Sequence, residues 1–95
     1  MAYKNTYTKL ERFCNSFASR KRIEILYLLS QKDNLTLDEI TEKIHTVKQN
    51  ASLHTFKLLN QGLIAKRQNK RNVEHIITKR GLFVLDFIQK IDKKI

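Results

Sequence analysis

The sequence predicts a mainly α-helical domain that carries one small β-hairpin. Three observations lead to this fold class: two short helices separated by a tight turn, a basic hairpin directly after them, and an apolar helix near each end of the chain. The length of 95 residues and the hydrophobic fraction of 41% fit one folded domain, residues 1–95, with a modest core.

The first helix is expected over residues 8–18, where apolar residues recur at positions i, i+3, i+4 and i+7. These residues are Leu10, Phe13, Cys14 and Phe17. Ser19 is suited to cap a second helix, in which apolar residues keep helical spacing as far as Leu29. A polar break at residues 31–34 follows it.

Residues 36–61 predict a helix-turn-helix. Residues 36–39 (TLDE) form a capping box, in which the threonine hydroxyl and the glutamate carboxylate each satisfy a free backbone N–H group. Residues 46–49 (TVKQ) repeat this pattern ten residues later and open a second helix. Gly62 suits the left-handed residue that ends a helix. We therefore expect two helices joined by a tight turn around His45.

Residues 63–78 predict a basic hairpin. Residues 63–68 form one strand, 69–72 a polar turn, and 73–78 alternate as the return strand. A basic hairpin after a helix-turn-helix is the wing of a winged helix, so the expected fold is a winged helix-turn-helix with extra N- and C-terminal helices. Gly81 begins the last helix, over residues 81–94.

The charge is strongly positive and unevenly distributed. The 19 Lys and Arg against 9 Asp and Glu give a net charge of +10. Residues 45–80 hold a single acid, Glu74, whereas four of the five charged residues in 33–44 are acidic. Such a basic face indicates an anionic partner, most often nucleic acid and sometimes a membrane surface. The alternative is a surface that is charged only for solubility.

The sequence gives no support for export or a membrane location. It has no apolar run near the ~20 residues that span a bilayer, and its N-terminus has no apolar signal core. Its one cysteine, Cys14, excludes an intrachain disulfide framework and fits a reducing compartment. We expect a cytoplasmic, nucleoid-associated protein in which Cys14 is a small buried hydrophobe; a disulfide between symmetry mates is the alternative.

Catalysis and metal binding have no support either. The three histidines are scattered, with no cysteine or carboxylate set beside them. There is no Ser-His-Asp arrangement, glycine-rich phosphate loop or carboxylate pair. We expect no enzyme, no cofactor, no metal ion, and no evident small-molecule effector.

The second helix of the helix-turn-helix has an unusual outward face. At 100° per residue, its core side is formed by Ala51, Thr55, Leu58 and Leu59. The other side carries hydrogen-bonding side chains where a solvated helix would carry charge, and such side chains match base edges in the major groove. The residues expected to contact bases are Lys48, Gln49, Asn50, Ser52 and Leu53, and those expected at phosphates or the groove edge are His54 and Lys57.

Three alternatives apply to single residues of this face. Gln49 can complete its capping box instead of reaching a base. Asn50 can simply be solvated. Leu53 can fill the core if the helix is rotated from the expected angle.

Two further sets of cations are candidates. The hairpin tip, Arg67, Asn69, Lys70, Arg71 and Asn72, can lie along phosphates or in the minor groove, although hairpin tips are often charged for solubility alone.

Arg20 and Lys21 open a helix, where positive charge opposes the helix dipole, so a phosphate partner is plausible for either. The next residue, Arg22, can instead form a structural ion pair.

The terminal helices hold more apolar surface than one small core needs. We expect them to form a two-fold homodimer interface, with a monomer as the alternative. The interface residues expected are Leu10, Phe13, Cys14, Phe17, Val84, Phe87, Ile88 and Ile91.

These features resemble the winged-helix family of small ArsR-like transcription regulators. Residues 17–26 (FASRKRIEIL) resemble that family's first core helix, and residues 35–40 (LTLDEI) its first helix-turn-helix segment. Residues 51–54 and 62–64 resemble its recognition helix and the step into the wing. Residues 77–81 (ITKRG) are similar to the close of many archaeal winged helices, and the chain's size is similar to that of short regulators carried by archaeal viruses and plasmids.

The resemblance implies binding to double-stranded DNA and regulation of transcription. Metal-sensing members carry paired cysteines in the first helix-turn-helix helix, and residues 37–40 have none, so metal sensing is not implied. Thr55 stands where the family usually has leucine.

These features leave three candidate functions. The first is a sequence-specific regulator, and the second is an architectural DNA-binding protein without base reading. The third is a winged helix used for protein interaction, which the net charge of +10 argues against.

Overall fold

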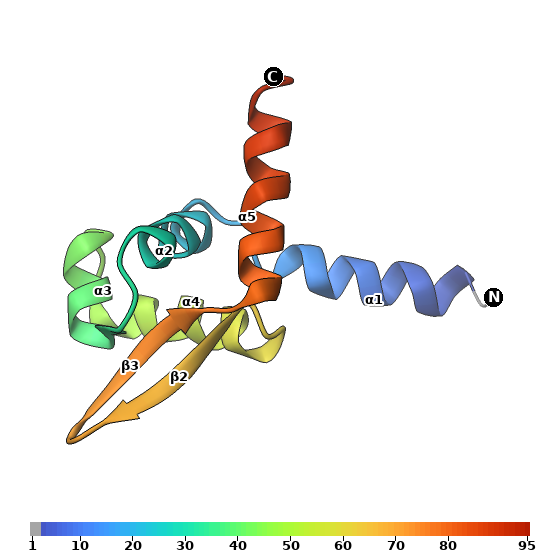
Figure 1. Cartoon of the computed structure of the whole chain (residues 1–95). Coiled ribbons are helices and arrows are strands. Elements are labelled where there is room, and N and C mark those ends of the chain that lie inside the picture. The colour runs from blue at the N-terminus through green and yellow to red at the C-terminus, as the bar shows by residue number, and fades with distance from the viewer. Residues whose placement is uncertain (1–2) are drawn as a thin grey trace.

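The computed structural model describes residues 3–95, which form a helical body with a small sheet at one side (Figure 1). In chain order the elements are α1 (Tyr3–Asn15), α2 (Arg20–Gln31), β1 (Leu35–Thr36), α3 (Leu37–Lys43), α4 (Lys48–Asn60), β2 (Ile64–Asn69), β3 (Asn72–Ile77) and α5 (Lys79–Asp92). This is the winged helix-turn-helix expected from the sequence, with α3 and α4 as its two helices and β2–β3 as the wing. Among the described residues, no helix is long and apolar enough to cross a membrane.

The sheet has three antiparallel strands in the order β1-β3-β2. The sequence predicted only the two strands of the wing. The third strand, β1, is two residues long and too short to show a period, and it forms because Leu35 pairs with His75. Beside it, Asp33 accepts a hydrogen bond from the N–H of Ile77 at 3.1 Å. The base of the wing is thereby tied to the segment between α2 and α3.

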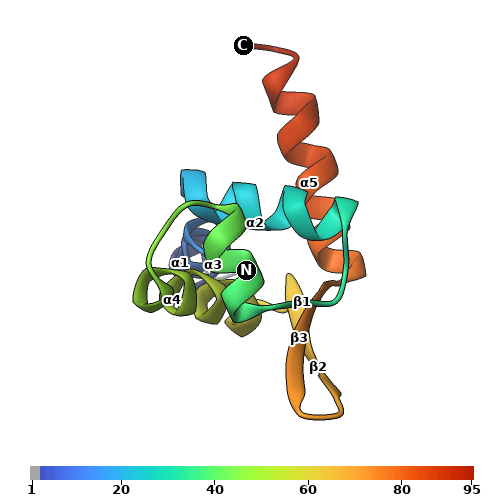
Figure 2. The ribbon, with the colours of Figure 1, turned by 90° about the vertical axis from the view of Figure 1, so that its left-hand side faces the viewer.

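The core lies where α2, α3, α4, α5 and the base of the wing meet. Its buried side chains are Ile25, Leu26, Leu29, Leu35, Ile40, Ile44, Leu58, Leu63, Ile64, Val84 and Leu85. The wing extends from one side of this body and α5 from the opposite side, while α1 extends away from α3 and the wing (Figures 1 and 2). Val84 was expected at a dimer interface, but it is buried in this core.

The two predicted capping boxes have different outcomes. The first is confirmed: the N–H of Glu39 donates to the Thr36 hydroxyl, and the Glu39 carboxylate accepts from the Thr36 N–H. The second is wrong by one residue, since α4 begins at Lys48 and its N-cap residue is Val47, with no side-chain cap. The turn before it uses a left-handed residue, His45 with φ 55°, which delays the start of the helix.

The terminal helices also differ from their predicted bounds. α1 lies earlier than residues 8–18, and α5 begins two residues before Gly81. Its N-cap is Thr78, whose hydroxyl oxygen accepts from the N–H of Gly81 at 3.1 Å. Gly81 lies inside the helix, and the position requires glycine because a Cβ there would sit 2.1 Å from the carbonyl oxygen of Leu63.

A pair of alanine substitutions tests this close contact. Gly81→Ala should lower the free energy of unfolding by about 3 kcal/mol, because backbone atoms must move apart. Gly62→Ala should cost only about 1 kcal/mol, since its φ of +73° is strained but its nearest neighbour is the end of the Arg80 side chain at 3.6 Å. Urea melts of the two variants measure the difference. Equal losses would contradict the assignment of a steric role to Gly81.

Candidate nucleic-acid interface

The rotation of α4 is set by its buried face. Ala51, Thr55 and Leu58 are buried, as the helical spacing predicted. The Thr55 hydroxyl donates to the backbone oxygen of Ser52 at 3.0 Å, so its polar group is satisfied inside the core. Threonine can therefore occupy this buried position without leaving a polar group unsatisfied. Leu53 is 52% exposed, which excludes the alternative that it fills the core.

The outward face of α4 holds the residues that the sequence placed there. Gln49, Asn50, Ser52 and Lys57 are exposed. Because α4 has no side-chain cap, Gln49 does not form the capping bond that was its alternative role. These residues share one surface with Leu53, and their amide, hydroxyl and ammonium groups are turned away from the core.

Sequence reasoning missed Phe56, which is 57% exposed on the same face. The signal was present in the helical period: Gln49, Leu53, Phe56 and Asn60 recur at i, i+4, i+7 and i+11 and therefore form one stripe. This stripe lies opposite the buried Ala51 and Leu58. Two large apolar side chains thus occupy the centre of the outward face.

Lys48, the first residue of α4, has a partner within the molecule. Its ammonium lies 3.1 Å from the carboxylate of Asp38, and both side chains are largely exposed. An exposed pair of this kind contributes about 0–1 kcal/mol. Lys48 can therefore exchange Asp38 for an external acceptor at small cost.

His54 takes part in an internal contact rather than lying free on the outward face. The Nε of Arg22 donates to His54 Nδ1 at 3.2 Å, and Arg22 also donates to the backbone oxygen of Asn15 at 2.5 Å. Arg22 thus forms hydrogen bonds rather than the expected ion pair, and it joins α2 to α4 and to the end of α1. Partial burial, followed by the charges of Arg22 and Lys21, lowers the pKa of His54.

The two cations at the start of α2 differ in availability. Lys21 donates to the backbone oxygen of Ile44, the C-cap residue of α3, so it serves the helix-turn-helix itself. Arg20 lies 3.1 Å from Glu24, with 89% of its side chain exposed. Of this pair, only Arg20 is directed mainly to solvent.

The tip of the wing presents exposed cations. Arg67, Lys70 and Arg71 are exposed, and within residues 3–95 no carboxylate lies within ion-pair distance of any of them. The tip is held by Gln68, whose side-chain amide donates to the backbone oxygen of Lys70 at 2.8 Å.

Glu74, the acid of the wing, contacts Asn69, one of the wing residues predicted to bind DNA. The side-chain amide of Asn69 donates to the Glu74 carboxylate at 3.3 Å. This contact restrains Asn69, while Asn72 at the start of β3 stays exposed.

The histidine of the wing, His75, is structural. His75 is buried, and its Nδ1 lies 3.0 Å from the backbone oxygen of Leu35, which ties β3 to β1. Burial lowers the pKa of His75, although the hydrogen bond to Leu35 opposes this shift. In the part of the chain that the structure describes, no three His, Cys, Asp or Glu residues lie close enough to hold a metal ion.

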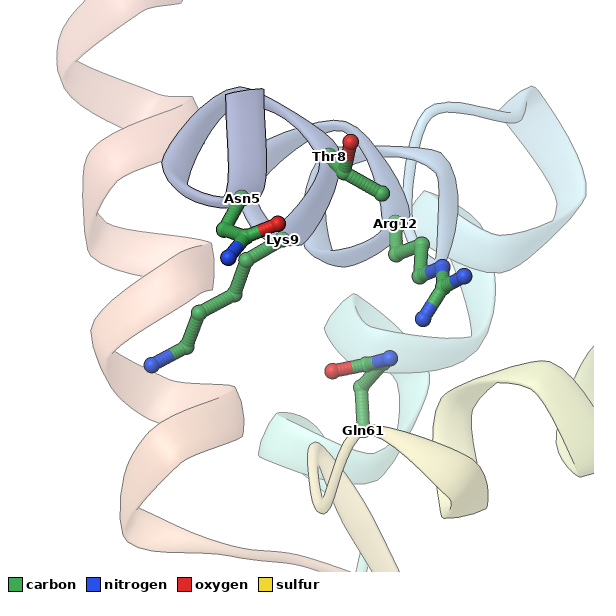
Figure 3. Close-up of a pocket in the computed structure, with 5 residues that line it drawn as sticks. All are labelled: Asn5, Thr8, Lys9, Arg12 and Gln61. Carbon is green, nitrogen blue, oxygen red and sulfur yellow. The ribbon is translucent and has the colours of Figure 1, made fainter. Parts of the chain in front are cut away.

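A polar hollow of about 380 Å³ lies between α1 and the end of α4 (Figure 3). The side chains that line it are Asn5, Thr8, Lys9, Arg12 and Gln61. This set contains amides, a hydroxyl and two cations but no carboxylate, imidazole or thiol. The hollow therefore brings together no acid–base pair for catalysis.

The terminal helices leave apolar surface uncovered. Leu10, Phe87 and Ile91 are each about half exposed, and Ile95 is almost fully exposed. A groove of about 650 Å³ runs between α2 and α5, past Tyr27 and the same Ile91. Among the other residues expected at an interface, Phe13, Phe17 and Ile88 are half-buried. Cys14 is exposed rather than buried as expected.

Comparison with proteins of known structure gives the same architecture over at least 94% of the chain. The winged helix-turn-helix domain of Mb0332 from Mycobacterium bovis, a homodimeric DNA-binding domain and possible ArsR-family regulator, superposes with a TM-score of 0.83 at 18% identity, covering 98% of this chain and 86% of that one. Rv0081 of M. tuberculosis gives a TM-score of 0.82 at 22% identity, covering 94% and 90%. MepR of S. aureus, in complex with DNA, gives 0.74 at 16% identity, covering 97% and 79%.

The fold is thus the winged helix-turn-helix of transcription regulators. The sequence model of the MarR family matches residues 19–73, and the chain belongs to that family. The ArsR-like resemblance therefore holds at the level of the shared fold, while the family that matches is MarR. None of the curated proteins matches the sequence.

The contact between Arg22 and His54 predicts a pH dependence of stability. Since the folded-state pKa of His54 lies below the unfolded value of about 6.5, the unfolded chain takes up a proton first as the pH falls. The stabilising effect is present above about pH 6.5 and is lost as the pH drops below it. The free energy of unfolding should fall more steeply in the wild type than in His54→Gln, whose amide oxygen can still accept from Arg22. Equal slopes between pH 7.5 and 5 would count against this role of His54.

Proposed function

We propose that this protein is a transcription regulator that binds a specific sequence of double-stranded DNA. α4 enters the major groove, and the wing contacts the backbone or the minor groove. The observation that carries the proposal is the outward face of α4, where exposed uncharged hydrogen-bonding groups lie beside the cationic wing.

The chemistry of that face fits base edges. Asn50 and Gln49 can each form two hydrogen bonds with adenine, and Lys48 can donate to the acceptors of guanine. Ser52 can bond to several base edges, and Leu53 offers an apolar contact to the methyl group of thymine. All five residues lie in the first two turns of α4, and the N-terminal part of a recognition helix is the part that contacts base edges.

The cations around this face supply contacts that do not depend on sequence. Arg67, Lys70 and Arg71 reach phosphates from the wing, with Asn69 and Asn72 beside them. Lys57 and Arg20 are exposed and reach phosphates from the body. Lys21 and His54 contribute mainly by holding the helices in place, because both already have internal partners.

The similar structures support a DNA partner and a dimer. MepR was solved in complex with DNA, and the Mb0332 domain is homodimeric. We infer that this chain also forms a two-fold homodimer, through exposed and half-buried apolar residues of α1, of the segment after it and of α5, so that two α4 helices address a pseudo-palindromic site. The side chains inferred to form the interface are Leu10, Phe13, Cys14, Phe17, Phe87, Ile88 and Ile91.

Such a regulator needs no catalysis, cofactor or small-molecule effector, and it binds the genome in the cytoplasm.

The second candidate is an architectural protein that uses the same surface without reading bases. The net charge of +10 is the observation that favours it, because charge alone gives sequence-independent binding.

A salt series with a selected operator and a random duplex separates the two functions. Selection from a random pool first identifies the operator. A specific regulator should prefer the operator by about 10³-fold or more at physiological salt. Equal affinities that fall together with salt would identify the architectural role. No binding to either duplex at low salt would exclude both.

Two substitutions test which surface reads bases. Asn50→Ala should lose discrimination of about 1–3 kcal/mol at one base pair, because its amide would no longer match the adenine edge. Arg71→Ala should weaken operator and random duplex alike and reduce the salt slope by about one. Competition binding with single-base operator variants measures both. An unchanged preference in Asn50→Ala would show that another surface reads the sequence.

The dimer is tested without DNA. The wild type should sediment as a dimer at micromolar concentration, and Phe87→Glu should sediment as a monomer because it places a charge in the apolar interface. Val73→Glu is the matched control, since Val73 is also about half exposed but lies on the wing. It should remain dimeric. A monomeric wild type would contradict the proposed assembly.

A further inference from the structure

The outward face of α4 has an apolar centre that the proposed hydrogen bonds leave unexplained. Leu53 and Phe56 are 52% and 57% exposed, and they are neighbours three residues apart on one helix. Phe56 lines two shallow hollows, one shared with Gln49 and Asn50 and one shared with the wing. Within residues 3–95, the surrounding residues leave about half of each of these two side chains uncovered.

Polar and cationic groups surround this apolar centre. Gln49 and Asn50 lie toward the start of the helix, and Lys57 lies one residue beyond Phe56. On the wing side, the hollow beside Phe56 is bordered by Lys66 and by the half-exposed Val73. A partner of this surface must therefore carry negative charge at its edges and small apolar groups at its middle.

We infer that Leu53 and Phe56 read the 5-methyl groups of pyrimidines in the major groove, so that each half-site carries two neighbouring thymines, or 5-methylcytosines, beneath them. This inference rests on the proposed function and names the operator chemistry it requires. The major groove has phosphates along its edges, and the thymine methyl is its exposed apolar group.

The spacing of the two side chains fits neighbouring base pairs. Three residues of α-helix advance about 4.5 Å, and successive base pairs are separated by about 3.4 Å. Leu53 and Phe56 can therefore each cover one methyl group on base pairs next to each other. Phe56 becomes a specificity-determining residue that neither charge nor hydrogen-bonding capacity would have identified.

An anionic membrane surface is the other partner with charged edges and an apolar interior. The observations favour DNA, because the apolar centre contains only two large side chains on α4 and lies among the amides of Gln49 and Asn50. Amides match the donors and acceptors of base edges, whereas an interfacial helix has a wide apolar face and a strongly charged polar face.

The experiment removes single methyl groups from the selected operator. Replacing thymine with deoxyuridine keeps every hydrogen-bonding group and deletes only the methyl. At the two contacted positions, wild-type affinity should fall about fourfold for each methyl group removed. This factor corresponds to the ~0.8 kcal/mol that burial of one CH₂ group contributes. Replacing the same thymines with cytosine should weaken binding further, and 5-methylcytosine should recover the methyl contribution.

The same duplexes are then bound by two variants. Phe56→Ala should bind the thymine duplex about tenfold more weakly, about 1.4 kcal/mol, and should lose sensitivity to deoxyuridine at its own position while keeping sensitivity at that of Leu53. Lys57→Ala, one residue along the helix, is the matched control. It should bind every duplex more weakly and retain the full methyl sensitivity. Because both side chains are exposed, circular dichroism should show unchanged folding.

The outcomes separate this inference from the proposed function. If a specific operator is bound but no deoxyuridine substitution changes affinity, or if Phe56→Ala keeps the methyl sensitivity of the wild type, methyl reading is wrong and sequence-specific binding stands. If no operator is selected, both are wrong. Loss of binding to phosphatidylserine vesicles in Phe56→Ala, with methyl sensitivity unchanged, would assign the surface to a membrane and overturn the inference.

Discussion

The burial of one face of α4 determines what the rest of the surface can do. Ala51 and Leu58 are fully buried against the core, and Thr55 joins them because its hydroxyl bonds to the backbone of its own helix. Because Leu53 lies nearly opposite these residues on the helix, only a rotation by close to half a turn would bury it. Since the core side is close-packed, the outward stripe from Gln49 to Asn60 is fixed in direction before any partner binds.

A second constraint positions the wing and α5 relative to that helix. The Thr78 hydroxyl donates to the backbone oxygen of Gly62 and accepts from the N–H of Gly81, while the N–H of Thr78 donates to Leu63. Arg80 adds a bond to the backbone oxygen of Gln61 at 3.0 Å. The end of α4, the base of the wing and the start of α5 are therefore one hydrogen-bonded junction. The surface that meets a nucleic acid and the helix inferred to form a dimer are joined through it.

Much of this arrangement could be predicted from the sequence because it depends on local patterns. The capping box of Thr36 and Glu39, the left-handed Gly62 and the core face of α4 follow from spacing within one or two turns. The predictions that were wrong concern features that depend on residues distant in the sequence. β1 forms only because Leu35 meets His75, 40 residues away. The second predicted capping box does not form, since the turn at His45 takes up one more residue and α4 begins later than expected. Val84 was misplaced because an apolar helix face does not reveal which of its residues meet the protein's own core.

The net charge of +10 does not translate directly into ten phosphate contacts, because several cations already have partners in the molecule. Lys21 satisfies the end of α3, Arg22 joins three helices, and Arg80 serves the junction at Gln61. The cations of the wing tip have no carboxylate partner within residues 3–95 and therefore present their full charge to solvent. The wing tip thus offers exposed cations without a carboxylate partner in this range, whereas Lys21 and Arg22 of α2 also hold the scaffold. These exposed cations attract an anionic partner to the wing, and the outward face of α4, whose direction is fixed by its buried side, borders the same hollow as the wing.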